Sequence, residues 1–135
     1  MKTLIRASAL MVAALGVSSP AMAAWPEKPI TLIVPAAPAG TTDITARLLS
    51  EKLGAALGTT VVVENRAGAA GIIGTQALLR SAPDGYTIMV HSSSHTVSPS
   101  TFAKLPFDTL NDFAGVTPIS STPNVLVMSP TKNIK

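Results

Sequence analysis

Two histidines flank three serines in one short segment, His91-Ser92-Ser93-Ser94-His95. These residue types could supply a nucleophile and its base, but a serine hydrolase also needs a carboxylate that orients the histidine. The chain contains no G-x-S-x-G motif, the turn that exposes the serine of α/β hydrolases. We therefore interpret the segment as a hydroxyl-rich loop whose two histidines face the surface or a ligand. A secreted α/β serine hydrolase that uses this loop remains the alternative.

The same two histidines have the i, i+4 spacing of metal ligands on a helix. We expect the intervening serines to continue the end of a strand, however, and no acidic third ligand lies nearby in the sequence. Gly68, Gly71 and Gly74 depart from the dinucleotide-binding pattern, because position 70 is alanine and the segment follows the second expected strand. Close packing of a helix on the sheet explains these glycines better. We expect neither a metal nor a cofactor.

A second candidate site lies where the β-branched strand Ile30–Val34 runs into a loop rich in proline and glycine. Prolines at positions 35 and 38 restrict the course of the loop, and Thr41 or Thr42 is placed to cap the helix that follows. A loop of this kind directs free N–H groups and the positive end of the helix dipole to one point, which suits a carboxylate or a phosphate. The same residues also fit an ordinary βα turn.

The alternation of strands and helices predicts an α/β fold with a mainly parallel sheet, because βαβ crossovers bring successive strands parallel. Gly58 is placed to end the first helix, which we expect over residues 43–57 with an apolar face of Ile44, Leu48, Leu49, Leu53 and Leu57. We expect a second helix to about residue 81, short helical turns near residues 98–103 and 111, and strands at residues 30–34, 60–64, 86–90, 114–120 and 124–129. Ligands of such sheets bind outside the carboxyl ends of the strands, where three loops lie, at residues 35–43, 65–74 and 91–95.

Residues 1–23 have the pattern of a secretory signal peptide. Lys2 and Arg6 accompany an apolar run, and Ala21-Met22-Ala23 forms an A-x-A cleavage pattern. This predicts export to the periplasm, after which residues 24–135 remain. Cleavage would remove two of the ten basic residues and lower the formal net charge from +3 to +1, so the basic precursor does not indicate nucleic-acid binding. The chain has no cysteine, which excludes disulfides and thiolate metal sites.

Several motifs occur in the order found in one receptor family. They include Trp25-Pro-Glu-Lys-Pro29, Pro38 with Gly40 and Asp43, Val62-Val-Glu-Asn-Arg66, Ala82-Pro-Asp-Gly-Tyr86, Leu105-Pro-Phe-Asp108 with Asp112-Phe113, and Pro123-Asn-Val-Leu-Val127. Over nearly all of residues 25–130 the chain resembles the extracytoplasmic solute-binding receptors of tripartite tricarboxylate transporters, also called Bug receptors.

This resemblance implies a type II periplasmic-binding-protein fold of two α/β lobes. It implies no catalysis, but capture of a small carboxylate between the lobes and its delivery to the membrane subunits of the transporter. In the family the loop after the first strand holds a ligand carboxylate through backbone amides and bridging water, which here implies ligand binding by Ala37, Pro38, Ala39, Gly40, Thr41, Thr42 and Asp43. The loop after the third strand is the next candidate, with Ser92, Ser93, Ser94 and His95.

The sequence departs from the family pattern at two loops. The family usually has two glycines after Pro38, and this chain has Ala39 before Gly40. After Arg66 the family usually has Pro-Gly-Ala-Gly-Gly, and this chain has Ala67-Gly-Ala-Ala-Gly71. Family members are also about twice the size of a typical single domain. We therefore expect residues 24–135 to be the N-terminal part of the first lobe, with the second lobe missing from this sequence.

Overall fold

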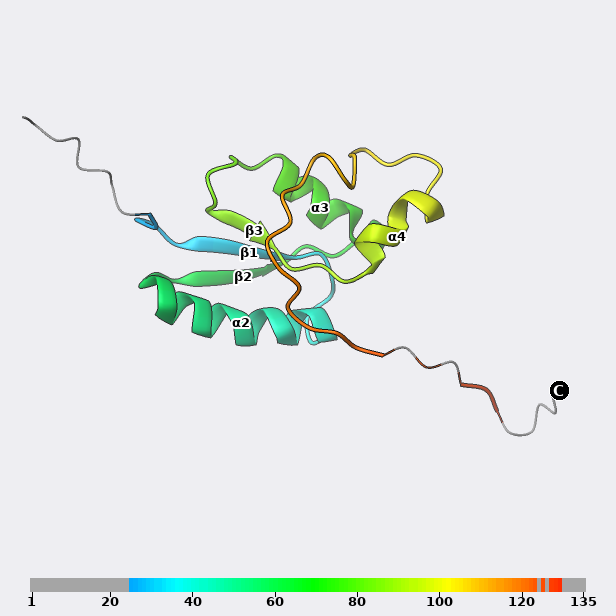
Figure 1. Cartoon of the computed structure of the whole chain (residues 1–135), viewed down its shortest axis with the longest axis horizontal. Coiled ribbons are helices and arrows are strands. Elements are labelled where there is room, and N and C mark those ends of the chain that lie inside the picture. Colours follow the sequence, from blue (N-terminus) through cyan, green and yellow to red (C-terminus); the bar gives the residue numbers. More distant parts are fainter. Residues whose placement is uncertain (1–24, 124, 126, 130–135) are drawn as a thin grey trace, which may run out of the picture.

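The computed structural model describes residues 25–123, 125 and 127–129. Strands β1 (Ile30–Val34), β2 (Val61–Asn65) and β3 (Thr87–Met89) form one parallel sheet in the order β2-β1-β3. Helix α2 (Thr41–Leu57) joins β1 to β2, and α3 (Ile72–Leu79), preceded by the 3₁₀ turn Ala69–Gly71, joins β2 to β3. The helices cover opposite sides of the sheet (Figure 1), as right-handed crossovers in opposite directions require. The predicted α/β fold with a parallel sheet is confirmed.

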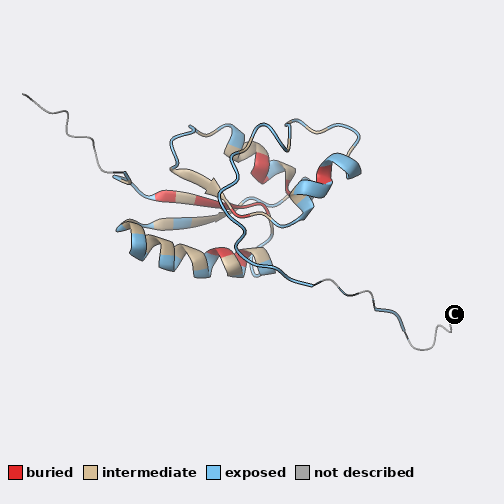
Figure 2. Cartoon of the chain, viewed as in Figure 1, coloured by how far each residue is buried: buried red, intermediate tan, exposed pale blue. Residues whose placement is uncertain are grey.

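The centre of the sheet is β1, which is buried on both faces. Ile30, Leu32, Ile33 and Val34 are each at most 2% exposed, and most of β1 has the colour of buried residues in Figure 2. Leu32 pairs with Val63 on one side and with Ile88 on the other. A strand covered by helices on both faces has no solvent side, which explains why β1 is a continuous apolar run and not an alternating one. This burial fixes the position of the loop that leaves β1.

Helix α2 begins two residues earlier than expected and packs through a different face. Ala46 is fully buried beneath the helix, whereas Ile44 and Leu48 are 53% and 64% exposed. The predicted apolar face is therefore wrong for these two residues, because the small Ala46 and the carboxylate of Asp43 occupy the side that meets the sheet. The end of the helix is as predicted: Gly58 is left-handed (φ 65°) and its N–H bonds to the carbonyl of Gly54.

Close packing explains the glycines after β2, as expected from the sequence. A Cβ at Gly74 would lie 2.6 Å from Cβ of Pro35 and 2.9 Å from the carbonyl oxygen of Arg66, so only glycine lets α3 approach the end of β1. Gly71 is left-handed (φ 95°), and a Cβ there would lie 2.8 Å from Nε2 of His91. These glycines bring the loops after all three strands together.

The last part of the described chain differs from expectation. Helix α4 (Ser94–Thr101) begins within the serine segment, so these serines do not continue β3, which ends at Met89. Residues 114–120 form no strand, and neither do residues 125 and 127–129; residues 124 and 126 lie outside the described residues. Their side chains meet solvent, with Val116 90% and Val125 80% exposed, and a strand without a partner leaves its backbone unpaired.

The expected signal peptide, residues 1–23, lies outside the described residues. Within the described part of the chain, no helix is both long enough and apolar enough to cross a membrane.

Candidate functional site

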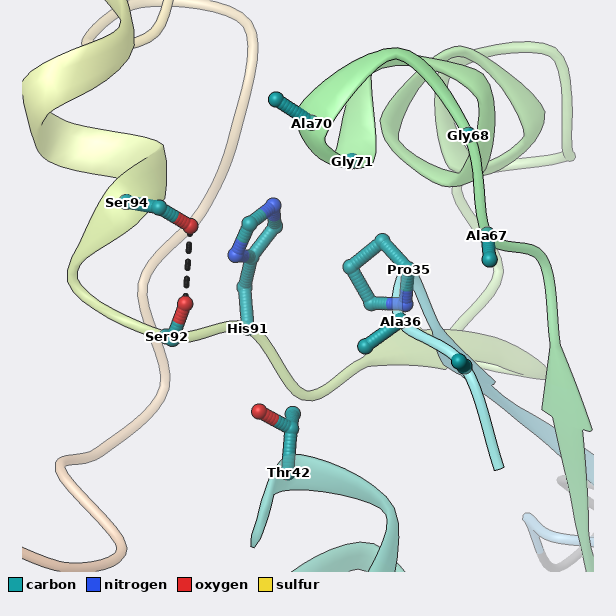
Figure 3. A pocket seen from close by; sticks show the side chains of 11 residues that line it. Pro35, Ala36, Thr42, Ala67, Gly68, Ala70, Gly71, His91, Ser92 and Ser94 are labelled. Carbon is teal, nitrogen blue, oxygen red and sulfur yellow. Dashed lines mark hydrogen bonds between the residues drawn. The ribbon is translucent and has the colours of Figure 1, made fainter. Parts of the chain in front are cut away.

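A cleft of about 370 Å³ opens at the carboxyl end of the sheet (Figure 3). It is lined by residues from the three loops that leave β1, β2 and β3, together with the first turns of α2 and α4: Pro35, Ala36, Ala37, Thr42, Ala67, Gly68, Ala70, Gly71, His91, Ser92 and Ser94. In the strand order β2-β1-β3 the chain winds first to one side of β1 and then to the other. Ligands of open α/β sheets bind beyond the carboxyl ends of the strands, where the winding changes direction in this way.

Four of the eleven residues expected to bind the ligand line this cleft: Ala37, Thr42, Ser92 and Ser94. The others belong to the same loops but do not line it: Pro38, Ala39, Gly40, Thr41, Asp43, Ser93 and His95. The individual residues missed were Pro35, Ala36, Ala67, Gly68, Ala70, Gly71 and His91. All seven lie within the three loops that the sequence analysis placed at the carboxyl ends of the strands, so the sequence indicated their loops but not the residues themselves.

Asp43 organises the loop after β1 from inside the protein. Its side chain is only 3% exposed, and it accepts hydrogen bonds from the N–H of Ala39 (2.8 Å), from Nε of Arg47 (3.0 Å) and from Nδ2 of Asn65 (2.8 Å). Asn65 also donates to the carbonyl of Ala36 (3.3 Å) and accepts from Nη2 of Arg47 (3.0 Å). The carboxylate thus joins the loop, the start of α2 and the end of β2, and acts as a positioning residue behind the cleft.

The start of α2 is not capped by a threonine, contrary to expectation. The N-cap is Gly40, and no side chain bonds to it as a cap. Asp43, at the third helical position, instead reaches back to the N–H of Ala39, where its charge also opposes the positive end of the helix dipole. Thr42 is therefore free of a capping role and lines the cleft.

Hydrogen bonds hold the pKa of Asp43 at about 2, from an ordinary value of 3.8. The largest cause is the hydrogen bond from Arg47, followed by those from the Ala39 amide and the Asn65 side chain, whereas burial acts in the opposite direction. The carboxylate is therefore ionised at neutral and mildly acidic pH.

Both departures from the family's glycine pattern fall on left-handed backbone. Ala39 has φ 65° and Ala70 has φ 53°, and Ala69 beside it has φ 45°. A left-handed conformation costs an alanine about 1–2 kcal/mol because its Cβ approaches a carbonyl oxygen. The loops thus keep a glycine-type course with alanines, and the bonding of Ala39 to Asp43 helps to hold it.

His91 stands at the centre of the cleft, between Thr42, Pro35 and the serine pair (Figure 3). Its Nδ1 is buried and has no hydrogen-bond partner. Its ring lies 5.0 Å from that of His95, which in turn packs against Phe107 and Phe113 at 6.0 and 5.1 Å between ring centroids. Burial lowers the pKa of His91 below its usual 6.5, and the charge of His95 lowers it further.

The serine segment lacks the geometry of a hydrolase. The hydroxyls of Ser92 and Ser94 share a hydrogen bond of 2.8 Å, and in the described part of the chain neither imidazole is hydrogen-bonded to a serine hydroxyl. No cluster of three or more His, Asp or Glu side chains among these residues could hold a metal ion. What the cleft offers is hydroxyls, backbone amides and one imidazole, which suits binding of a polar molecule.

Comparisons with known proteins agree with this architecture. Protein BugT of Bordetella pertussis is 41% identical over 133 residues, which cover 96% of this chain and 41% of BugT. Solved structures include the periplasmic binding protein BugD (TM-score 0.63, 40% identity, 66% of this chain and 30% of BugD). They also include MatC from Rhodopseudomonas palustris with bound malate (TM-score 0.62, 33% identity, 66% of this chain and 31% of MatC). The chain therefore spans about two fifths of BugT and less than a third of these structures.

The fold is that of part of a periplasmic binding protein. Residues 45–135 match the family described as tripartite tricarboxylate transporter family receptor, and the chain belongs to that family. The resemblance noted in the sequence is thereby confirmed, and nothing in the relatives supports the hydrolase alternative.

Replacing Ala39 by glycine should stabilise the protein by about 1 kcal/mol, because glycine removes the strain of the left-handed conformation. Glycine also raises the conformational entropy of the unfolded chain, but this offsets only part of the gain. Urea unfolding measures the change. The matched control is Ala55→Gly on the exposed side of α2, where the backbone is helical and glycine should destabilise by about 0.5–1 kcal/mol. Equal effects of the two substitutions would contradict the assignment of strain to Ala39.

Replacing Asp43 by asparagine should destabilise the protein at neutral pH, and the difference from the wild type should shrink as the pH falls from 4 to 2. The reason is that the depressed pKa contributes stability that is complete above the unfolded-state value and is lost as the pH falls through the folded-state value. Urea unfolding at a series of pH values measures it. Glu51→Gln, on the exposed side of the same helix, is the control; a pH-independent difference for Asp43→Asn would contradict the prediction.

Proposed function

We propose that this protein is the solute-binding receptor of a tripartite tricarboxylate transporter and that it captures a small carboxylate at the cleft described above. Membership of the receptor family and the chemistry of the cleft support this proposal. The observation that carries it is the make-up of the lining: among the described residues it contains no Asp or Glu, and it includes Thr42 at the start of α2. The first N–H groups of a helix have no intrahelical acceptor and favour an anion.

The proposed ligand contacts are those of two loops. Residues Ala37, Pro38, Ala39, Gly40, Thr41, Thr42 and Asp43 would form the carboxylate-binding turn, with Asp43 in a positioning role and the amide of Ala39 already bonded to it. Ser92, Ser93, Ser94 and His95 would supply the facing edge, where the paired hydroxyls of Ser92 and Ser94 can turn to a ligand. MatC with bound malate shows that a relative holds a dicarboxylate.

The proposal extends to the rest of the receptor. Residues 24–135 would be the N-terminal part of the first of two lobes, consistent with the short span of BugT and BugD that they match. A second lobe would close on the cleft, and the loaded receptor would deliver its ligand to the membrane subunits of the transporter. The task is capture, and no catalytic step is proposed.

A dicarboxylate should stabilise the protein by mass action, by about 2.7 kcal/mol when its concentration is 100 times the dissociation constant. Thermal unfolding with malate, succinate, adipate and citrate tests this. Thr42→Val should weaken binding by about two- to tenfold through loss of one hydrogen bond. Thr45→Val, whose hydroxyl bonds to the carbonyl of Thr41 outside the cleft lining, should leave binding unchanged. Absence of any shift across the panel would contradict the proposed function.

We also expect the protein to be exported and cleaved after Ala23. Relatives include a periplasmic binding protein, which supports this location. N-terminal sequencing of the protein recovered from a periplasmic extract should begin at Ala24-Trp25-Pro26. Recovery of a chain that retains Met1 and Lys2, or its confinement to the cytoplasmic fraction, would contradict export.

A further inference from the structure

We propose that His91 is the group that neutralises the ligand carboxylate, and that binding takes up a proton at its imidazole. This inference rests on the proposed capture of a carboxylate and adds to it the residue that matches the charge. It starts from the composition of the cleft. Of the eleven residues that line it, ten have aliphatic, glycine or hydroxyl side chains, and His91 alone has one that can ionise.

The charged side chains near the cleft are paired with other groups of the protein. Arg47 and Asp43 bond to each other and to Asn65 behind the loop after β1. Arg66, after β2, pairs with Glu64 at 2.8 Å. From α4, the titratable group that faces His91 is His95, and the other neighbours are Gly71 before α3 and Pro35 after β1. Within the described residues, no Lys or Arg side chain therefore lines the cleft to meet an anion.

The imidazole of His91 is held where a ligand would enter. Its ring projects into the cleft between the loops (Figure 3), and glycine at position 71 leaves it room, since a Cβ there would lie 2.8 Å from Nε2. Its buried Nδ1 has no hydrogen-bond partner among the described residues. A buried polar atom without a partner is costly, and a buried charge without one is costlier still. Burial without a partner therefore disfavours the protonated imidazole in the free protein.

Burial and the neighbouring His95 keep the pKa of free His91 below 6.5. A bound carboxylate acts in the opposite direction and raises it, because an opposite charge at short range favours the protonated form. The proton is therefore taken from solvent on binding and returned on release. Binding should strengthen as the pH falls from the pKa of His91 in the complex to its pKa in the free protein. One proton taken up per ligand limits the rise of the association constant to about tenfold per pH unit.

The test is calorimetric titration of the purified protein with malate between pH 8 and pH 6. The association constant of the wild type should rise by up to about tenfold per pH unit. Repeating the titration in buffers of different ionisation enthalpy should show up to one proton taken up per malate bound. His91→Asn should abolish both the slope and the proton uptake. Arg80→Gln removes a positive charge from an exposed position outside the cleft lining and should retain both.

Nuclear magnetic resonance of the wild type provides a second measurement that does not depend on a variant. The chain has only two histidines, so both imidazoles can be followed through a pH titration. The pKa of His91 should rise when malate is present. An unchanged pKa, or malate binding without pH dependence or proton uptake, would overturn the role of His91 and leave the receptor function standing. Failure to bind malate, succinate, adipate or citrate at both pH 6 and pH 8 would overturn the two together.

Discussion

The buried carboxylate of Asp43 is the interaction on which the arrangement of the cleft depends. An ionised group that is only 3% exposed must be paired and hydrogen-bonded, and Asp43 meets that requirement with donors from the loop after β1, from α2 and from β2. The loop after β1 and the first turns of α2 are thereby tied to the end of β2, which lies further along the chain. The left-handed Ala39 and the exposed start of α2 follow from this tie, because the Ala39 amide must turn inward to reach the carboxylate.

The sheet could be predicted because its signals are local. The run Ile30–Val34 is apolar over its whole length, since both of its faces are covered, and Gly58 ends α2 by a left-handed cap that alanine would strain. Helical period predicted the apolar face of α2 only in part, because Leu49 packs against the core whereas Ile44 and Leu48 are exposed. The side of α2 that packs is decided by Asp43 and Ala46, one charged and one small, which hydrophobicity alone does not single out. Residues 114–120 had the composition of a strand but have no partner strand in the described part of the chain.

Sequence also located the candidate site at the level of loops but not of residues. The rule that ligands lie beyond the carboxyl ends of parallel strands selected all three loops, and all three meet at the cleft. Which residues face the cleft depends on the backbone conformation of the loops, which the residue types do not predict. Ala70 turns left-handed at a position where glycine would be expected, and His91 faces the cleft while His95 packs against Phe107 and Phe113. These contacts join α4, to which His95 belongs, to the segment that follows it.

The small residues of the cleft have a consequence for what it can distinguish. Alanine and glycine at positions 37, 67, 68, 70 and 71 leave the main chain at the surface, so the donors available there are mostly backbone amides. Backbone amides recognise a carboxylate group as such, and every small carboxylate carries one. Discrimination between carboxylates, which are the proposed ligands, then requires groups that reach the rest of the molecule. In the cleft itself those groups are the hydroxyls of Thr42, Ser92 and Ser94 and the imidazole of His91. Unlike a backbone amide, a hydroxyl can rotate toward the ligand and an imidazole can change its charge.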